Sequence, residues 1–135
     1  MIPSVSVAPD RVVIRGPRTA KVGQTLAFEC ATSNSNPASA VHWLIDGQPQ
    51  PALHNRTEVS DEGGWVTISN ISVTVGHTDK SKAITCVATN VALGTTEASP
   101  HIVTVLCKFK VTSRVAVVFT IYRRYVEDYH SRPTR

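Results

Sequence analysis

The sequence lacks the residue spacings that catalytic and metal sites require. Its five histidines stand apart, and it contains no His-x-x-x-His, no Cys-x-x-Cys and no cluster of carboxylates. Gly63-Gly64 has none of the flanking glycines or the lysine of a phosphate-binding loop, and no serine lies in a nucleophile-elbow context. The sequence therefore predicts no catalytic residue, no metal site and no cofactor. We expect that the protein is not an enzyme and has no small-molecule substrate.

Secretion and membrane-spanning signals are also missing. The N-terminus has neither a basic region nor an apolar region, so no signal peptide is visible. The apolar run at residues 115–122 is followed by Arg123 and Arg124, as at the cytoplasmic end of a membrane span. A span needs about 20 apolar residues, however, and this run is much shorter. We expect no complete transmembrane span in the chain.

Methionine occurs once, whereas valine and threonine are abundant and glycines and prolines interrupt short segments. This composition favours an all-β fold over a helical one. With 41% apolar residues in 135, the chain is long enough for one packed domain and a tail. Disorder is therefore not expected for the chain as a whole.

The net charge of +4 is unevenly divided along the chain. Residues 1–106 contain seven basic and eight acidic residues, whereas residues 107–135 contain seven basic and two acidic residues and all three tyrosines. The positive charge is therefore a property of the last segment, and it gives no support for nucleic-acid binding. We expect one domain at residues 1–106 and, at residues 107–135, a basic, aromatic-containing tail that is not part of the domain.

Three segments alternate apolar and polar residues with a period of two, which indicates strands with one buried face. Cys30 lies on the apolar face of the first segment, Trp43 on that of the second and Cys86 on that of the third. The two cysteines can therefore form a disulfide between two sheets, packed against the indole. The alternative is three unrelated core strands with reduced thiols.

This Cys-Trp-Cys pattern resembles the immunoglobulin-type β-sandwich. The fold prediction is therefore an all-β, immunoglobulin-like β-sandwich of about seven short strands with one inter-sheet disulfide. Many such domains place a tyrosine two residues before the second cysteine, but this chain has Ile84 there. That departure disfavours a variable-type domain and favours the constant-like set.

Four segments predict particular strand features. Gly16-Pro17 is expected to break the first strand, which then changes sheet, and residues 48–51 are expected to form an edge strand or a loop. Residues 55–62 are polar and give no strand pattern. The apolar parity changes between Ile68 and Ile71, which predicts a bulge near Ser69-Asn70 or two separate strands. The last strand is expected at residues 97–106.

A closer resemblance is carried by residues 22–26, 35–37, 43–47 and 62–70, which look like the ectodomain repeats of nephrin-type adhesion receptors, a group that includes hibris and sticks-and-stones. The last segment, Glu-Gly-Gly-Trp-Val-Thr-Ile-Ser-Asn, is the most specific. The resemblance implies a module of a cell-surface receptor that mediates cell-cell adhesion by binding another immunoglobulin-superfamily receptor, heterophilic or homophilic. Two alternatives stay open: a spacer repeat that binds nothing, and a secreted immunoglobulin-type binding protein.

The predicted bridge implies an oxidising compartment, hence the extracellular face of the plasma membrane as part of a larger protein, and it leaves Cys107 unpaired. Asn55-Arg-Thr57 and Asn70-Ile-Ser72 are N-glycosylation sequons. Trp65, beside a Gly-Gly break, is either a partner contact or a second core aromatic that covers the end of the sandwich, and the second interpretation is favoured.

Overall fold

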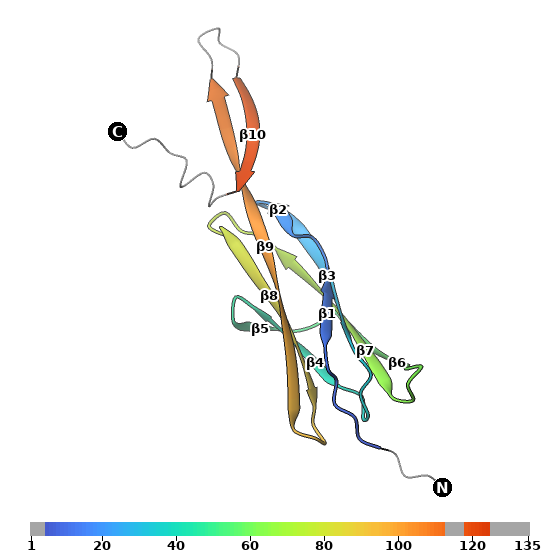
Figure 1. Cartoon of the computed structure of the whole chain (residues 1–135). Helices are drawn as coiled ribbons and strands as arrows, with labels where there is room; N and C mark the ends of the chain where they lie inside the picture. Colours follow the sequence, from blue (N-terminus) through green and yellow to red (C-terminus); the bar gives the residue numbers. More distant parts are fainter. Residues whose placement is uncertain (1–4, 113–117, 125–135) are drawn as a thin grey trace.

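The computed structural model describes residues 5–112 and 118–124 of the chain. These residues form two β-sheets packed face to face (Figure 1), and none of them lies in a helix. The all-β sandwich prediction is therefore confirmed. The strands are β1 (Val12–Arg15), β2 (Thr19–Lys21), β3 (Thr25–Thr32), β4 (Ala40–Ile45), β5 (Gln48–Gln50), β6 (His54–Val59), β7 (Trp65–Thr74), β8 (Ser81–Asn90), β9 (Thr95–Thr112) and β10 (Val118–Arg124).

One sheet has the strand order β1-β3-β7-β6, and the other has the order β10-β9-β8-β4-β5. β1 pairs antiparallel with β3, whereas β2 crosses to the other sheet and pairs parallel with β9. Gly16-Pro17 lies between the two strands, so the predicted change of sheet is confirmed. A proline fits this position because it lies outside both strands and donates to neither ladder.

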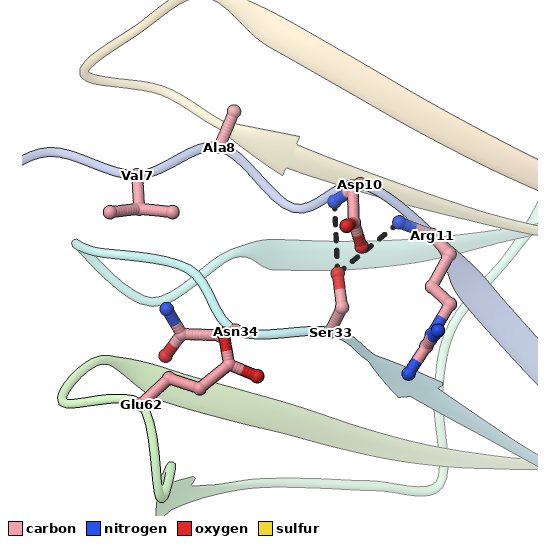
Figure 2. A pocket seen from close by; sticks show the side chains of 7 residues that line it. All are labelled: Val7, Ala8, Asp10, Arg11, Ser33, Asn34 and Glu62. Carbon is pink, nitrogen blue, oxygen red and sulfur yellow. Dashed lines mark hydrogen bonds between the residues drawn. The ribbon is translucent and has the colours of Figure 1, made fainter.

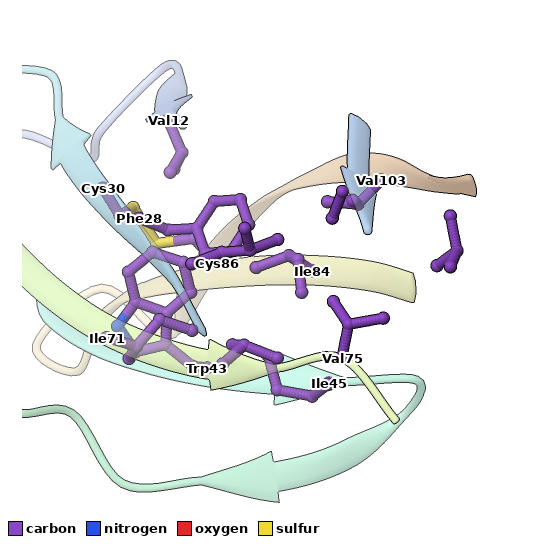
Figure 3. Packing of buried hydrophobic residues seen from close by; sticks show 14 of the residues in the cluster. Val12, Phe28, Cys30, Trp43, Ile45, Ile71, Val75, Ile84, Cys86 and Val103 are labelled. Carbon is purple, nitrogen blue, oxygen red and sulfur yellow. A yellow bond between two sulfur atoms is a disulfide. The ribbon is translucent and has the colours of Figure 1, made fainter. Parts of the chain in front are cut away.

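The core is built around the disulfide between Cys30 of β3 and Cys86 of β8, which joins the two sheets with a Cα–Cα distance of 6.4 Å. Trp43 of β4 packs beside it and is fully buried, as Figure 3 shows. The predicted inter-sheet bridge and the core tryptophan are therefore present. The cluster around them consists of Val12, Ala20, Leu26, Phe28, Ile45, Ile71, Val73, Val75, Ile84, Ala88, Val103 and Val105.

The predicted bulge near Ser69-Asn70 is wrong. β7 is one continuous strand whose register with β3 is unbroken across residues 68–74. Ser69 faces the core because its hydroxyl accepts a hydrogen bond of 2.8 Å from Trp43 Nε1, both side chains being buried. Ile68 lies on the outer face of the sheet, opposite Arg56 of β6 and Ala31 of β3. A buried polar residue therefore produced the apparent change of parity.

Two edge strands differ in how well the sequence predicted them. β5 forms the edge expected for residues 48–51, after a tight turn in which Asp46 and Gly47 have φ values of 51° and 83°. β6 was missed because all six of its residues are exposed, so it has no apolar alternation. It pairs along its length with β7.

The last sandwich strand is longer than the expected residues 97–106, because β9 continues to Thr112 and pairs antiparallel with β10. The two strands extend past the others at the upper end of the molecule in Figure 1. The division into a domain at residues 1–106 and a tail at residues 107–135 stays a prediction. Cys107 lies outside the side chains that the structure describes, so its predicted free thiol is also untested.

Candidate functional site

One face of the larger sheet carries no charged residue across β5, β4, β8 and residues 95–104 of β9. Trp43 and Ile84 point into the core, so the alternate positions of their strands face outward. The register places these outward residues in rows that run across the four strands. We call them the uncharged face; they are Ala40, His42, Leu44, Pro49, Ala83, Thr85, Val87, Thr89, Thr96, Ala98, Pro100 and Ile102.

The centre of the uncharged face combines aliphatic side chains with small polar ones. Val87 lies there, between His42 on β4 and Ala98 on β9, and is only 8% exposed although it faces away from the core. Ile102, farther along β9, is 51% exposed. Interfaces between proteins are depleted of charged residues at their centre, and this composition matches them.

The outer face of the opposite sheet is charged instead. Arg15 of β1 lies directly across from Glu29 of β3 in the register. On β6, Arg56 Nε donates a hydrogen bond of 3.1 Å to Glu58 Oε1, with both side chains exposed. Exposed pairs of this kind contribute about 1 kcal/mol or less to stability. This second face is therefore typical of a solvated surface, and the two faces differ in chemistry.

A second candidate surface is the end of the sandwich near the N-terminus, at the bottom of Figure 1, which we call the loop end. It consists of residues 5–11, 33–37, 60–65 and 91–94. Backbone pairs hold it together, Val7 with Asn36 and Ser35 with Trp65. Exposed apolar side chains at or beside it are Val5, Val7, Val59, Trp65, Val91 and Leu93.

Trp65 is 39% exposed at this end. The favoured interpretation of Trp65 as a core aromatic is therefore wrong. It lies on the inward-facing side of β7 with the buried Thr67 and Ser69, but at the rim of the sandwich, where no strand of the other sheet covers it fully. Its role as a partner contact stays a prediction.

A hollow of about 200 Å³ separates the N-terminal segment from the loop around residues 33–34 (Figure 2). Ser33 Oγ accepts hydrogen bonds from the backbone N–H groups of Asp10 (2.9 Å) and Arg11 (3.2 Å). Glu62 lines the other side of the hollow. The serine hydroxyl is occupied in holding the N-terminal segment, so the hollow follows from how the loops pack.

Asn90 fastens the loop end from inside and is fully buried. Its Nδ2 donates to the carbonyl oxygen of Val7 at 2.9 Å and to Ser35 Oγ at 3.1 Å, and its Oδ1 accepts from the N–H of Leu93 at 3.1 Å. A buried amide with donors and acceptor satisfied holds three loops in one arrangement. Asn90 was not predicted from the sequence, because one asparagine at the end of a strand belongs to no motif.

The two sequon asparagines lie on neighbouring strands. Asn55 is exposed on β6, and Asn70 is half-buried on β7, where it lies opposite His54 of β6 and Glu29 of β3. Cys30, Cys86 and Trp43 are in the core and distant from solvent. The structure therefore brings the predicted core residues together and places the predicted surface residues on the charged side and at the loop end.

The uncharged face was not predicted from the sequence as a site. A sequence pattern that indicates this face is nevertheless present. The segment Ala83-Ile-Thr-Cys-Val-Ala88 is uncharged at every position, and its apolar residues do not alternate with charged ones. Strands that are covered on both faces read as continuous apolar runs. In β8 one set of alternate residues fills the core and the other set forms the uncharged face.

Within residues 5–112 and 118–124, no group of three or more His, Cys, Asp and Glu side chains is placed to hold a metal ion. Lys82 bridges two carboxylates, at 3.6 Å from Asp46 and 3.4 Å from Asp79. Those carboxylates also accept backbone hydrogen bonds, from Ala83 and Gly76, so the cluster fastens two turns.

The described part of the chain has no helix with the length and apolar character to cross a membrane.

Comparison with known families and structures agrees with this architecture. Residues 7–97 match the model of the CD80-like C2-set immunoglobulin domain. Human Kin of IRRE-like protein 3 is 29% identical over 93 residues, which are 67% of this chain and 12% of that protein. The chain therefore spans only 12% of the length of the curated relatives that it matches.

Solved structures share the fold at lower sequence identity. The full ectodomain of mouse nectin-like molecule 4 superposes with a TM-score of 0.66 and 19% identity, covering 88% of this chain and 46% of that one. The structure of Rst D1-D2 gives a TM-score of 0.64 and 18% identity, covering 76% of this chain and 50% of that one. At these sequence identities, the similarity to the two solved structures shows a shared fold only.

Proposed function

The chain belongs to the CD80-like C2-set immunoglobulin domain family, and from this premise we propose that it is an extracellular recognition module of a cell-surface adhesion receptor. In this proposal it binds another immunoglobulin-superfamily receptor on a neighbouring cell. The receptor is of the nephrin type, a relation supported by the similarity to Kin of IRRE-like protein 3. Its place is the extracellular face of the plasma membrane, within a larger polypeptide.

The uncharged face is the observation that carries this proposal. A solvated sheet face normally carries charged residues, as the opposite sheet does with Arg15, Glu29, Arg56 and Glu58. A surface region that is depleted of charged residues has the composition found at the centre of interfaces between proteins. The fold itself does not require apolar residues at these outward positions, so their composition points to binding rather than to packing.

Recognition by such a face needs no chemistry, only shape and burial. Each half-exposed aliphatic side chain that a partner covers contributes through the area removed from water, at about 25 cal/mol per Å². A single module of this size gives modest affinity, because association also costs translational and rotational freedom. Many modules and many copies on two apposed membranes raise the overall strength by avidity.

The proposal is tested by placing a sugar on the uncharged face. The substitution Ile102→Asn creates an Asn-Val-Thr sequon at an exposed position, with Thr104 as its third residue. We expect the secreted variant to lose about tenfold or more of its binding to cells that display nephrin-type or Kin of IRRE-like receptors, since a glycan there prevents close approach.

The matched control is the double variant Ile102→Asn with Thr104→Ala, which has the same asparagine but no sequon. It is expected to bind more tightly than the glycosylated variant, because it loses only the contacts of one isoleucine. Binding measured by flow cytometry that is equal for wild type and the glycosylated variant would exclude the uncharged face. A folded, disulfide-bonded wild type that binds none of these receptors would favour the spacer alternative.

A further inference from the structure

The five asparagines of the chain fall into two groups by how they use their side-chain amides. Asn34 Oδ1 accepts from the N–H of Gly64 at 2.9 Å, Asn36 Nδ2 donates to the carbonyl oxygen of Val5 at 2.8 Å, and Asn90 is bonded at both ends. None of these three begins a sequon. Within the described residues, the amides of Asn55 and Asn70 make no hydrogen bond to another protein group.

The two asparagines with free amides are therefore the two that begin sequons. Asn55 is followed by Arg and Thr57, and Asn70 by Ile and Ser72. A glycan attached to either one displaces no structural hydrogen bond. A chance triplet has no reason to select the asparagines that the fold leaves unused.

We propose that Asn55 and Asn70 carry N-linked glycans and that the glycan on Asn55 masks a self-complementary edge strand. The inference rests on the proposed function in one respect, since modification requires passage through the secretory pathway. The amide nitrogen Nδ2 forms a bond to the anomeric carbon of a polyprenyl-diphosphate-linked oligosaccharide and loses one proton. The bond from that carbon to the phosphate oxygen breaks, the polyprenyl diphosphate leaves with its electron pair, and nothing is oxidised or reduced.

The edge that this glycan covers is β6. All of its residues are exposed, and β7 is its neighbour on one side while it ends the sheet on the other. Unpaired N–H and C=O groups along an edge strand are a template for pairing with another chain. Proteins commonly protect such edges with charged side chains, especially lysine, with proline or with a bulge. β6 contains no lysine and no proline, and its register with β7 is regular.

The charges of β6 favour pairing with a second copy of the chain. Arg56 and Glu58 lie on either side of Thr57 and neutralise each other within one strand. In an antiparallel pair centred on Thr57, Arg56 of each copy lies opposite Glu58 of the other. Opposite charges directly across a ladder stabilise it, and the arrangement has the two-fold symmetry of a homodimer.

A glycan on Asn55 prevents this pairing because Asn55 lies within the strand, two residues from its symmetric centre. The glycan on Asn70, on the adjacent strand, covers the neighbouring part of the same sheet. Asn70 is on the outer face of this sheet, Asn55 is at its edge in register with the inward-facing Ser69, and neither asparagine lies on the uncharged face. The modification leaves that face accessible while it keeps β6 from joining two copies edge to edge.

Glycan occupancy is measured on the full chain, which is fused to an added signal peptide and secreted from cultured human cells. Peptide mapping with enzymatic deglycosylation in ¹⁸O-water is expected to label Asn55 and Asn70 and no other asparagine. Unmodified Asn55 in the secreted, disulfide-bonded protein would overturn the proposal. Because no partner receptor is present, this result does not depend on whether the uncharged face binds one.

Masking is measured by light scattering after size-exclusion chromatography. Thr57→Ala with Ser72→Ala removes both sequons, whereas Thr57→Ser with Ser72→Thr keeps them and serves as the matched control. We expect the dimer dissociation constant of the sequon-free variant to be at least about tenfold lower than that of the control. At a concentration where the sequon-free variant is dimeric, the control is expected to be monomeric. Equal association of the two variants would overturn the masking role.

A third variant locates the contact. Thr57→Lys with Ser72→Ala also lacks both glycans, but it places two lysines opposite each other at the centre of the proposed pair, where like charges destabilise the ladder. This variant is expected to return to the monomeric state. A dimer that persists with Lys at position 57 would show that association uses another surface, and it would refute the role of β6.

Discussion

Replacing Ser69 by alanine tests the hydrogen bond between Ser69 and Trp43 in the core. Ser69 Oγ accepts the hydrogen bond of Trp43 Nε1 at 2.8 Å, and both residues are 0% exposed. Without the hydroxyl the indole N–H stays buried with no acceptor. Leaving a buried neutral donor unsatisfied costs about 1–3 kcal/mol, which corresponds to a fall in Tm of roughly 4–8 °C per kcal/mol for a domain of this size.

The measurement is urea unfolding followed by circular dichroism, on oxidised protein made in the bacterial periplasm so that no glycan is present. Ser72→Ala is the matched control, since Ser72 lies on the same strand but faces outward and uses no side-chain hydrogen bond. We expect the control to change the free energy of unfolding by less than about 0.5 kcal/mol.

A double-mutant cycle with Trp43→Phe separates the hydrogen bond from the loss of volume. If the contact acts as described, the double variant loses less stability than the sum of the single variants, with a coupling of about 0.5–3 kcal/mol. The reasoning is refuted if Ser69→Ala costs no more than Ser72→Ala, or if the coupling is zero. Either result would mean that the indole N–H finds another acceptor in the variant.

Two further predictions concern the bridge and the loop end. Replacing both Cys30 and Cys86 by alanine opens a loop with a sequence separation of 56, and the chain-entropy relation gives a loss of about 4 kcal/mol in the free energy of unfolding. Urea midpoints compared with the oxidised wild type measure this, and a loss below about 1 kcal/mol would contradict it. Gly64→Ala places a Cβ 2.5 Å from Asn34 Oδ1 and 2.8 Å from the carbonyl oxygen of Ser35, so we expect a cost of about 1–3 kcal/mol. An unchanged Tm in a thermal scan would contradict this, because it would show that the loop around Asn34 and Ser35 shifts to accommodate the added methyl group.

The central part of the fold was predictable because its signals are local and regular. Cys30, Trp43 and Cys86 lie on apolar faces of alternating segments, and each is in the core. The break at Gly16-Pro17 was readable because adjacent glycine and proline commonly mark a turn or the end of a strand. These residues determine both sheets and the bridge between them, so the architecture followed from them.

The predictions were wrong where a side chain lies in an environment that is unusual for its residue type. Ser69 is polar and buried because Trp43 supplies its partner, a contact 26 residues away that alternation cannot reveal. β6 is a strand without any buried residue, so it has no periodic pattern. Trp65 was expected in the core partly because the family resemblance ties it to the fold, whereas its position at the rim leaves it 39% exposed.

The candidate surfaces were harder to predict than the fold, for a physical reason. A binding face is recognised by what lies side by side across strands, and that depends on the register. Leu44, Thr85 and Pro100 are far apart in the sequence, yet they form one row on the uncharged face. The free amides of Asn55 and Asn70 were equally invisible, because a sequon does not show which asparagines the fold uses.

In the adhesion role proposed above, the parallel pairing of β2 with β9 would have a mechanical consequence. The N-terminal segment lies at one end of the sandwich and the paired segments of β2 and β9 lie toward the other, so a pull on the two ends of the domain acts along these strands (Figure 1). The hydrogen bonds that join Thr19–Lys21 to Thr104–Leu106 are then sheared together, and no bond opens before its neighbours. Once they fail, the Cys30–Cys86 bridge still holds back the residues between its ends, roughly 190 Å of extended chain. A stretched domain therefore extends by only part of the contour length of its chain, because the segment between Cys30 and Cys86 stays closed by the disulfide.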